Sequence, residues 1–277
     1  MQPGLTHPPL LVFSDDWGRH PSSCQHLVRH LLPRHRVYWV NTIGMRTPQL
    51  NLATLARGLE KVRQWLRPAG SGETLPANLR VLNPRMWPWF SSSCARLLNR
   101  RLLVRGLAAL VRSLPEPPVA VTTIPIVADL MGVLPVRRWV YYCVDDFGEW
   151  PGLDQATLRR MEEGVIRRAD TLIAVSETLQ ARLRRAREEV HLLTHGIDHD
   201  YWSAGDDGEA LPQLAGLERP LVVFWGVLDR RMDARCVRAL AAGLDRGTVV
   251  LVGPKADPDP ALFESGRVVH IPPLPYD

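Results

Sequence analysis

Three histidines spaced four residues apart occur in the segment HLLTHGIDHD, residues 191–200. They are His191, His195 and His199. Imidazole nitrogens are common zinc ligands, and side chains four residues apart share one face of a β-strand. Gly196 ends the apolar run before the third histidine, so a regular strand does not carry all three. The segment therefore predicts a strand followed by a tight turn, and we expect no metal site.

Two pairs of adjacent carboxylates follow apolar segments that have the pattern of buried strands. Asp15 and Asp16 follow PPLLVFS, and Asp145 and Asp146 follow RWVYYCV. Adjacent side chains on a strand point to opposite sides, so Asp145 and Asp146 are not a dyad acting on one substrate atom. One of them can bind substrate hydroxyls while the other caps a helix or pairs with an arginine. The sequence leaves open which one does which.

The loop DDWGRHP combines acid–base groups with a glycine. Asp16 and His20 can orient hydroxyl groups or support proton transfer, and Gly18 allows the loop to fold over a ligand. The alternative for Asp16 is a helix cap. Thr123 follows a later strand, in VAVTTIPIV, and Ser176 in AVSETL has the sequence of an N-cap.

In the last quarter of the chain, two glycines end apolar segments and basic side chains follow them. Gly226 ends PLVVFWG ahead of Arg230 and Arg231, and Gly253 ends GTVVLVG ahead of Lys255. Glycine lets a backbone amide approach a phosphate closely, and the arginine fork suits a diphosphate. The alternative for each loop is an ordinary solvated turn.

Short apolar segments alternate with helical patterns along the chain, which predicts an α/β protein with a parallel sheet and helices on both faces. Ligands bind beyond the C-terminal ends of such strands, where the residues above lie. The first expected helix has Ser22 or Ser23 as its cap. Its core face is expected to contain Leu27, Val28, Leu31 and Leu32. Further helices are expected around LATLARGLEKVRQWL and over residues 91–114 and 154–168.

The pattern predicts two domains of unequal size. Residues 1–203 form a Rossmann-like, doubly wound domain, and residues 204–218 (AGDDGEALPQLAGLE) have the composition of a linker. Residues 219–277 begin a second α/β domain with three strands and one clear helix, well short of a usual doubly wound domain.

Composition narrows the class of protein. The chain has 277 residues, 45% of them hydrophobic, and a net charge of +5. Its cysteines form no CxxC pair, its first apolar run is short and ends in aspartates, and no segment is long enough to span a membrane. We therefore expect a cytoplasmic protein. Arginines are distributed without an aromatic–basic motif, so we expect no nucleic-acid partner.

Residues 84–112 combine aromatic and basic side chains. PRMWPWF precedes a helix with apolar positions 97, 98, 102, 107, 110, 111 and 114. Its other face is expected to carry Arg96, Arg100, Arg101, Arg105 and Arg112. Such a helix can lie on an anionic membrane, giving a peripheral membrane protein. The alternative is a core helix with a solvated basic face.

Taken in order, several segments resemble the two-domain GT-B glycosyltransferases, specifically the family 4-like enzymes of polysaccharide and cell-envelope biosynthesis. The segments are SDDWGRHPSSCQHL, YYCVDDFGEW, ADTLIAVSETL, LLTHGIDHDYW, VVFWGVLDRRMDARCVRALA, VVLVGP and VVHIPPLPYD. Together they cover nearly the whole chain. A dinucleotide-dependent enzyme is not expected, because SDDWGRHPS lacks G-x-G-x-x-G.

The resemblance implies transfer of a sugar from a nucleotide diphosphate sugar, usually with retention, to a polysaccharide or lipid-linked acceptor. It implies no metal or other cofactor, since basic and amide groups neutralise the diphosphate. Implied donor-binding residues are Gly226, Arg230, Arg231, Gly253 and Lys255. Implied catalytic residues are Asp16, His20 and Asp146. Implied acceptor-side residues are Gly18, Asp145, Thr123 and His195, although many members have histidine where Thr123 stands.

The resemblance also implies a donor-binding E-x7-E stretch that these 277 residues do not contain. We therefore expect a truncated second domain and little transferase activity from this chain alone. The alternative function is a non-catalytic binding or scaffold protein derived from the same fold.

Overall fold

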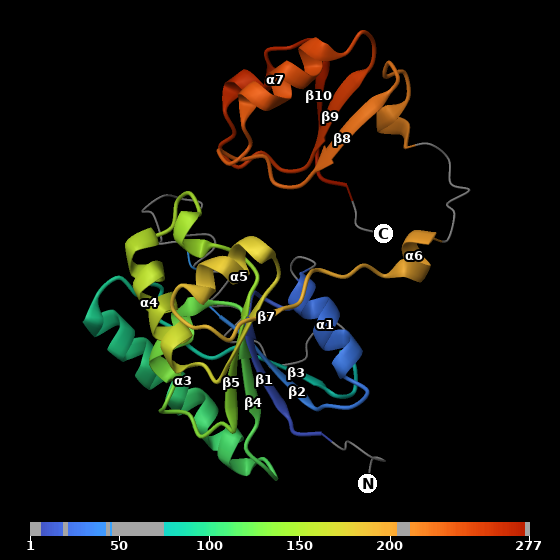
Figure 1. Cartoon of the computed structure of the whole chain (residues 1–277). Coiled ribbons are helices and arrows are strands. Elements are labelled where there is room, and N and C mark those ends of the chain that lie inside the picture. Colours follow the sequence, from blue (N-terminus) through green and yellow to red (C-terminus); the bar gives the residue numbers. More distant parts are fainter. Residues whose placement is uncertain (1–6, 19–21, 43–44, 46–74, 204–210, 275–277) are drawn as a thin grey trace. The chain divides into compact units, whose positions relative to one another are not determined.

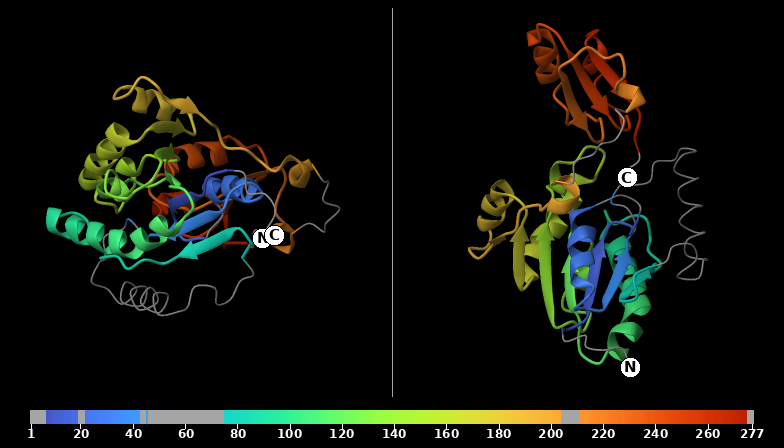
Figure 2. Two further views of the ribbon diagram at one scale, coloured as in Figure 1. Left: turned by 90° about the horizontal axis from the view of Figure 1, so that it is seen from below. Right: turned by 90° about the vertical axis from the view of Figure 1, so that its right-hand side faces the viewer.

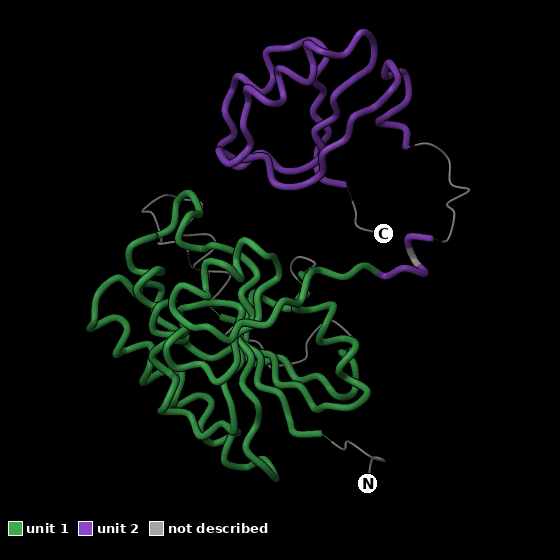
Figure 3. The backbone as a smooth tube through the Cα atoms, viewed as in Figure 1, with its two compact units in different colours: residues 1–197 green, residues 198–277 purple. Residues whose placement is uncertain are grey.

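The computed structural model describes residues 7–18, 22–42, 45, 75–203 and 211–274 (Figure 1). The chain divides into two compact units, residues 1–197 and 198–277 (Figure 3). The helix expected around LATLARGLEKVRQWL lies outside the described residues, as does part of the expected linker.

Unit 1 contains a seven-stranded sheet in which every pair of neighbours is parallel. Its strands are β1 (Leu10–Ser14), β2 (Val37–Asn41), β3 (Leu79–Leu82), β4 (Val119–Thr122), β5 (Arg138–Cys143), β6 (Thr171–Ala174) and β7 (His191–Leu192). The spatial order is β3-β2-β1-β4-β5-β6-β7. This order reverses direction between β1 and β4, which confirms the predicted doubly wound α/β fold and locates its topological switch point.

Helices cover both faces of this sheet (Figures 1 and 2). They are α1 (Ser23–Leu31), α3 (Ser93–Ser113), α4 (Gln155–Arg168) and α5 (Glu177–Arg184), with short 3-10 helices η1 (Pro125–Leu130) and η2 (Phe147–Glu149). Successive side chains of β1 point to opposite faces of the sheet, and each face has its own buried cluster. Leu11 and Phe13 share a buried cluster with α3 and α4, whereas Leu10 and Val12 share one with α1.

Four helices of unit 1 begin at a side-chain cap. Ser22, Ser92, Asp154 and Ser176 each accept a hydrogen bond from the amide three residues later. Such a cap satisfies one amide at a helix start and contributes about 1 kcal/mol. The cap predicted at Ser176 and the helix predicted over 154–168 are confirmed.

The predicted core faces of α1 and α3 are partly wrong. Leu27 and Leu31 are exposed, and α1 instead buries the stripe Cys24, Val28 and Leu32. In α3, Leu97 and Leu98 are exposed, while the buried side is Ala95, Asn99, Leu103, Leu107, Ala108 and Val111. Arg96 was expected on the basic outer face, but it is partly buried and paired with Asp129 at 3.3 Å.

Unit 2 contains a three-stranded parallel sheet of order β10-β9-β8. Its elements are α6 (His199–Ser203), η3 (Pro212–Leu214), β8 (Leu221–Trp225), α7 (Ala234–Gly243), β9 (Thr248–Val252), η4 (Pro260–Phe263) and β10 (Val268–Ile271). A small buried core forms from Leu228, Ala241, Val249 and Leu251. In the described part of the whole chain, no helix is long and apolar enough to cross a membrane.

Candidate functional site

Two hydroxyl groups bridge the switch point of unit 1. Ser14 at the end of β1 and Thr123 after β4 lie 2.8 Å apart, Oγ to Oγ1, and both are buried. The amide of Thr123 donates to the carbonyl of Phe13, and Thr42 Oγ1 donates to the carbonyl of Ser14. These contacts join the C-terminal ends of three strands, β1, β2 and β4, at the edge where doubly wound sheets bind ligands.

The loop after β1 is held by hydrogen bonds to its backbone. Trp39 Nε1 donates to the carbonyl of Asp15 at 2.9 Å, and the Trp17 amide donates to Asn41 Oδ1 at 2.9 Å. Gly18 has a φ of +76°, which favours glycine, and its amide donates to Gln25 Oε1. Asp15 is exposed and Asp16 is half-buried, and both directly follow β1 at the switch point. His20 lies outside the described residues.

His195 lies against the start of α1. Its Nδ1 is 2.7 Å from Ser23 Oγ, although the two residues are 172 positions apart in sequence. The imidazole is exposed and therefore reaches solvent beside the loop that follows β1. This hydrogen bond connects the segment after β7 to the start of α1. Among the described residues, no group of three histidine, cysteine or acidic side chains is placed to hold a metal ion.

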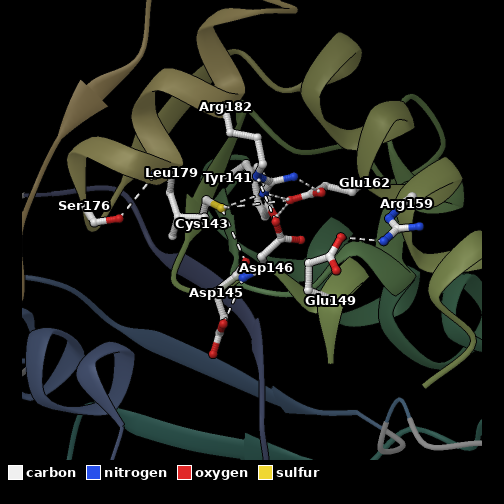
Figure 4. Close-up of polar contacts among 10 residues, drawn as sticks. All are labelled: Tyr141, Cys143, Asp145, Asp146, Glu149, Arg159, Glu162, Ser176, Leu179 and Arg182. Atoms are coloured by element: carbon white, nitrogen blue, oxygen red, sulfur yellow. Dashed lines mark hydrogen bonds and ion pairs between the residues drawn. The ribbon is translucent and has the colours of Figure 1, made fainter. Parts of the chain in front are cut away.

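The two carboxylates after β5 have different surroundings (Figure 4). Asp146 Oδ2 lies 3.5 Å from Arg182 Nε, so Asp146 is the member of the pair that meets an arginine. Asp145 Oδ1 accepts a hydrogen bond from the Asp146 amide at 2.9 Å, and its side chain extends away from the arginine (Figure 4). Asp145 is therefore better placed than Asp146 to meet a ligand.

A buried carboxylate lies beneath this loop. Glu162 on α4 accepts hydrogen bonds from Nη1 and Nη2 of Arg182, both at 2.7 Å, and from the Tyr141 hydroxyl at 2.6 Å. The hydrogen bonds to Glu162 raise the pKa of Arg182, and burial raises the pKa of Tyr141 well above its usual value. Glu162 therefore has a permanent cation and a neutral hydroxyl donor as partners.

The thiol of Cys143 belongs to the same cluster but is not poised for chemistry. Its Sγ lies 3.5 Å from Nη2 of Arg182 and 3.9 Å from Oε1 of Glu162. Burial raises its pKa to about 11. A thiol with such a pKa is almost entirely protonated near neutral pH, so Cys143 fills the core and does not act as a nucleophile.

Sequence reasoning missed this cluster of Tyr141, Glu162 and Arg182. Glu162 has an acidic neighbour, Glu163, and Arg182 lies in the arginine-rich segment RLRRAR. Neither segment distinguishes the buried residue from its exposed neighbours. The only available signal was the expectation that Asp145 or Asp146 meets an arginine.

In unit 2, the loops after β8 and β9 lie side by side. The Gly226 amide donates to the carbonyl of Val252, and the Leu228 amide donates to that of Pro254. Gly226 and Gly253 have φ values of +152° and +140°, which favour glycine. A Cβ atom on Gly253 would lie 1.9 Å from the Gly226 carbonyl oxygen. The close approach of two backbones thus requires glycine at position 253, while a Cβ atom on Gly226 would lie 3.1 Å from the Phe224 ring.

The basic side chains of these loops already have partners. Arg230 pairs with Asp257 at 2.7 Å, and this hydrogen bond lowers the pKa of Asp257. Asp257 is the only described non-glycine residue with a positive φ, +65°. Arg231 pairs with the buried Asp229 at 2.8 Å. Lys255 Nζ instead lies 4.0 Å from the centroid of the Phe263 ring, and the lysine is exposed.

The structure therefore brings the predicted residues together in two groups, one in each unit. In unit 1, Asp15, Asp16, Gly18 and Thr123 surround the switch point, and Asp145 and Asp146 follow the neighbouring strand, β5. In unit 2, Gly226, Arg230, Gly253 and Lys255 lie on paired loops. Arg231 lies on the same loop as Arg230 but points to Asp229.

No protein-family model matches the chain, and no curated protein matches its sequence. Solved structures do resemble it. Anabaena Alr3699/HepE in complex with UDP and glucose matches over 96% of this chain and 69% of its own, with 16% identity and a TM-score of 0.56. The same protein in complex with UDP alone matches over 95% and 69%, with 15% identity and a TM-score of 0.54.

The fold is GT-B-like. Its two units are each built on a parallel sheet with helices, as predicted from the resemblance. At this level of identity, the likeness to Alr3699/HepE is a likeness of fold.

Proposed function

We propose that the protein is a glycosyltransferase that uses a nucleotide diphosphate sugar. The observation that carries this proposal is the likeness, over 96% of the chain, to a structure that holds UDP and glucose. Polar and acidic groups at the switch point of unit 1 are consistent with it, because such groups can bind the hydroxyls of a sugar.

The donor is assigned to the paired loops of unit 2. Backbone amides at glycines can approach a phosphate closely, and Lys255 offers an exposed ammonium group to which no carboxylate of the described residues is paired. Arg230 can add a second cation if the phosphate takes the place of Asp257. We propose that these groups neutralise the diphosphate, without a metal ion or another cofactor.

The acceptor is assigned to unit 1, and we propose a polysaccharide or lipid-linked glycan. Asp145 and the loop with Asp16 and His20 are proposed to bind its hydroxyls and to assist proton transfer. Asp146 is retained as a candidate catalytic group, with its position set by Arg182. Retention of the anomeric configuration is part of the proposal.

Calorimetry with the 277-residue chain tests donor binding. We expect UDP and UDP-sugars to bind in the presence of a chelator, and Lys255→Gln to weaken binding about tenfold, because one charge-assisted contact to phosphate is lost. Arg246→Gln is the matched control, since Arg246 is exposed and lies before β9, at the opposite end of that strand from Lys255.

Each outcome of this experiment is informative. Failure of UDP, UDP-glucose and GDP-mannose to bind would contradict the proposal, as would an equal effect of the two substitutions. Binding without transfer to any glycan acceptor would instead support a non-catalytic binding protein with the same fold. Stereochemistry is read from the product of a successful transfer by NMR.

A further inference from the structure

Both hydrogen-bonding groups of the Gly253 backbone are bonded to β10. The Gly253 amide donates to the carbonyl of Ile271 at 2.9 Å. The Gly253 carbonyl lies 2.8 Å from Nε2 of the His270 imidazole. Because a carbonyl oxygen can only accept a hydrogen bond, Nε2 carries the hydrogen, in the neutral ring as well as in the protonated ring. The hydrogen bond to Gly253 is therefore available in both charge states of His270.

The sheet of unit 2 directs His270 toward α7 and η4. In the parallel register of β9 and β10, His270 lies opposite Leu251, which belongs to the buried core of unit 2. Val268 comes two residues earlier, so it shares a face of the sheet with His270, and it packs against the same core. The half-buried imidazole thus lies at the C-terminal end of β10, where the loop after β9 begins.

His270 also contacts the aromatic ring on which Lys255 lies. The rings of His270 and Phe263 meet edge to face, with their centroids 6.1 Å apart and an interplanar angle of 76°. Lys255 Nζ lies 4.0 Å from the centroid of the Phe263 ring. The π electrons of an aromatic ring attract a cation, so this contact favours one direction of the flexible lysine side chain. Two structural links therefore join His270 to the loop after β9, one through Gly253 and one through Phe263.

The loop after β9 is in turn joined to the loop after β8. The Leu228 amide donates to the carbonyl of Pro254, and the Ala256 amide donates to the carbonyl of Leu228. The backbones of Gly226 and Gly253 lie too close together to admit a Cβ atom on Gly253. A shift of the Gly253 peptide would therefore disturb both loops.

We propose that His270 is a positioning residue for the donor diphosphate. The inference rests on the donor assignment made under Proposed function. His270 fixes the Gly253 peptide by a hydrogen bond and Phe263 by a ring contact, and through them it sets the place of the Lys255 ammonium group. Phosphates would then meet groups whose geometry is fixed before binding, so less conformational entropy is lost on association. His270 itself is not assigned to touch the phosphates.

Calorimetry of the full chain with UDP, in the presence of a chelator, tests the role in binding. His270→Leu removes the N–H donor and keeps an apolar side chain, so we expect the dissociation constant to rise about five- to tenfold as the loop loses a hydrogen bond. His270→Gln keeps an amide N–H at a similar reach from the backbone and should bind UDP within about twofold of wild type.

Val268→Ala is the matched control, because it removes a core contact on the same face of the same strand without touching the loop. We expect it to lower the unfolding temperature of unit 2 and to leave the dissociation constant for UDP unchanged. A purely structural role for His270 predicts instead that binding follows stability, so that Val268→Ala and His270→Leu weaken it alike.

A double-mutant cycle tests the link through the aromatic ring. Phe263→Leu should weaken UDP binding about threefold, because Lys255 loses the ring that directs it. In a chain that already carries Lys255→Gln, the same substitution should have no further effect, since the ring acts through the lysine. An equal effect of Phe263→Leu in both backgrounds would contradict this link.

Hydrogen exchange of the chain without ligand tests the loop independently of UDP. We expect faster exchange at Gly253 and Ala256 in His270→Leu, and wild-type exchange at these amides in His270→Gln and Val268→Ala. Unchanged exchange in His270→Leu, or unchanged UDP binding by that variant, would overturn the inference and leave the donor assignment intact. A wild-type chain that binds no UDP would instead overturn the donor assignment and, with it, the role of His270 in binding.

Discussion

At the scale of single residues, Arg182 connects two carboxylates from different elements. Its guanidinium donates twice to Glu162 of α4 and lies 3.5 Å from Asp146 in the loop after β5. Removing charge from only one side of such a partly buried pair is costly, because the remaining charge loses its partner but not its burial. The position of the loop that carries Asp145 therefore depends on Arg182, a residue of α5.

Replacing Glu162 should destabilise the fold. In Glu162→Ala, the Arg182 guanidinium and the Tyr141 hydroxyl lose their shared acceptor, so we expect the free energy of unfolding to fall by about 3 kcal/mol. Urea denaturation followed by circular dichroism measures it. Glu163→Ala is the control: Glu163 is exposed, pairs with Arg167 at 3.9 Å, and should change stability by no more than about 0.5 kcal/mol. Similar losses in both variants would contradict a structural role for Glu162.

At the scale of elements, the strands and the α/β class were predictable because apolar segments and helical patterns alternate clearly. The strand ends were predictable with them, which is why Asp15, Thr123 and Asp145 follow β1, β4 and β5 as expected. The partners of site residues were not predictable. Glu162 pairs with Arg182, 20 residues away in sequence, and Asp257 pairs with Arg230, 27 residues away. Such pairs depend on tertiary packing, which a local sequence pattern does not predict.

Helix faces were harder to predict than helices. In α1, the predicted face joined Leu27 and Leu31 to Val28 and Leu32, because all four are strongly hydrophobic. Packing against β1 and β2 buries Val28 and Leu32 together with the smaller Cys24, and leaves Leu27 and Leu31 exposed. In α3, the buried Asn99 holds the segment before the helix and sets its rotation, which leaves Leu97 exposed. A polar core residue of this kind gives no signal in a hydrophobic pattern.

The paired loops of unit 2 should not tolerate a side chain at Gly253. In Gly253→Ala, the Cβ atom would clash with the Gly226 carbonyl and the φ of +140° would be strained, so we expect unit 2 to lose about 2 kcal/mol or more. Hydrogen exchange read by mass spectrometry should show reduced protection of β8 and β9. Gly243→Ala is the control, because a Cβ there meets no atom within 4 Å. Unchanged protection in Gly253→Ala would rule out this account of the glycine.

At the scale of the whole molecule, the two units differ in how their sheets are covered. In unit 1, β1 is buried along its whole length. In unit 2, β8 lies at a sheet edge within the described residues, and its last three side chains are exposed although Val222 packs against the core. Val223, Phe224 and Trp225 are 43%, 41% and 70% exposed. An apolar edge strand of this kind is prone to pair with another chain.

We therefore expect the 277-residue chain to self-associate as its concentration rises. Val223→Lys with Trp225→Lys should restore a monomer, because charges on an edge strand oppose pairing and reduce the apolar area. Sedimentation velocity measures the change. Val133→Lys serves as the control, since Val133 is a similarly exposed valine in unit 1. A wild-type chain that stays monomeric at every concentration would contradict the expectation.

Under the proposed donor assignment, a diphosphate would reach an Arg230 guanidinium that is already paired with Asp257. The phosphate would have to replace the Asp257 carboxylate as the hydrogen-bond acceptor of Arg230. The binding affinity would therefore reflect the difference between the strengths of these two interactions. The displaced aspartate holds a left-handed backbone, at φ +65°, that costs an L-residue on the order of 1 kcal/mol. Release of Asp257 would let the backbone around it relax. Binding of a phosphate to Arg230 would then change the backbone conformation of that turn.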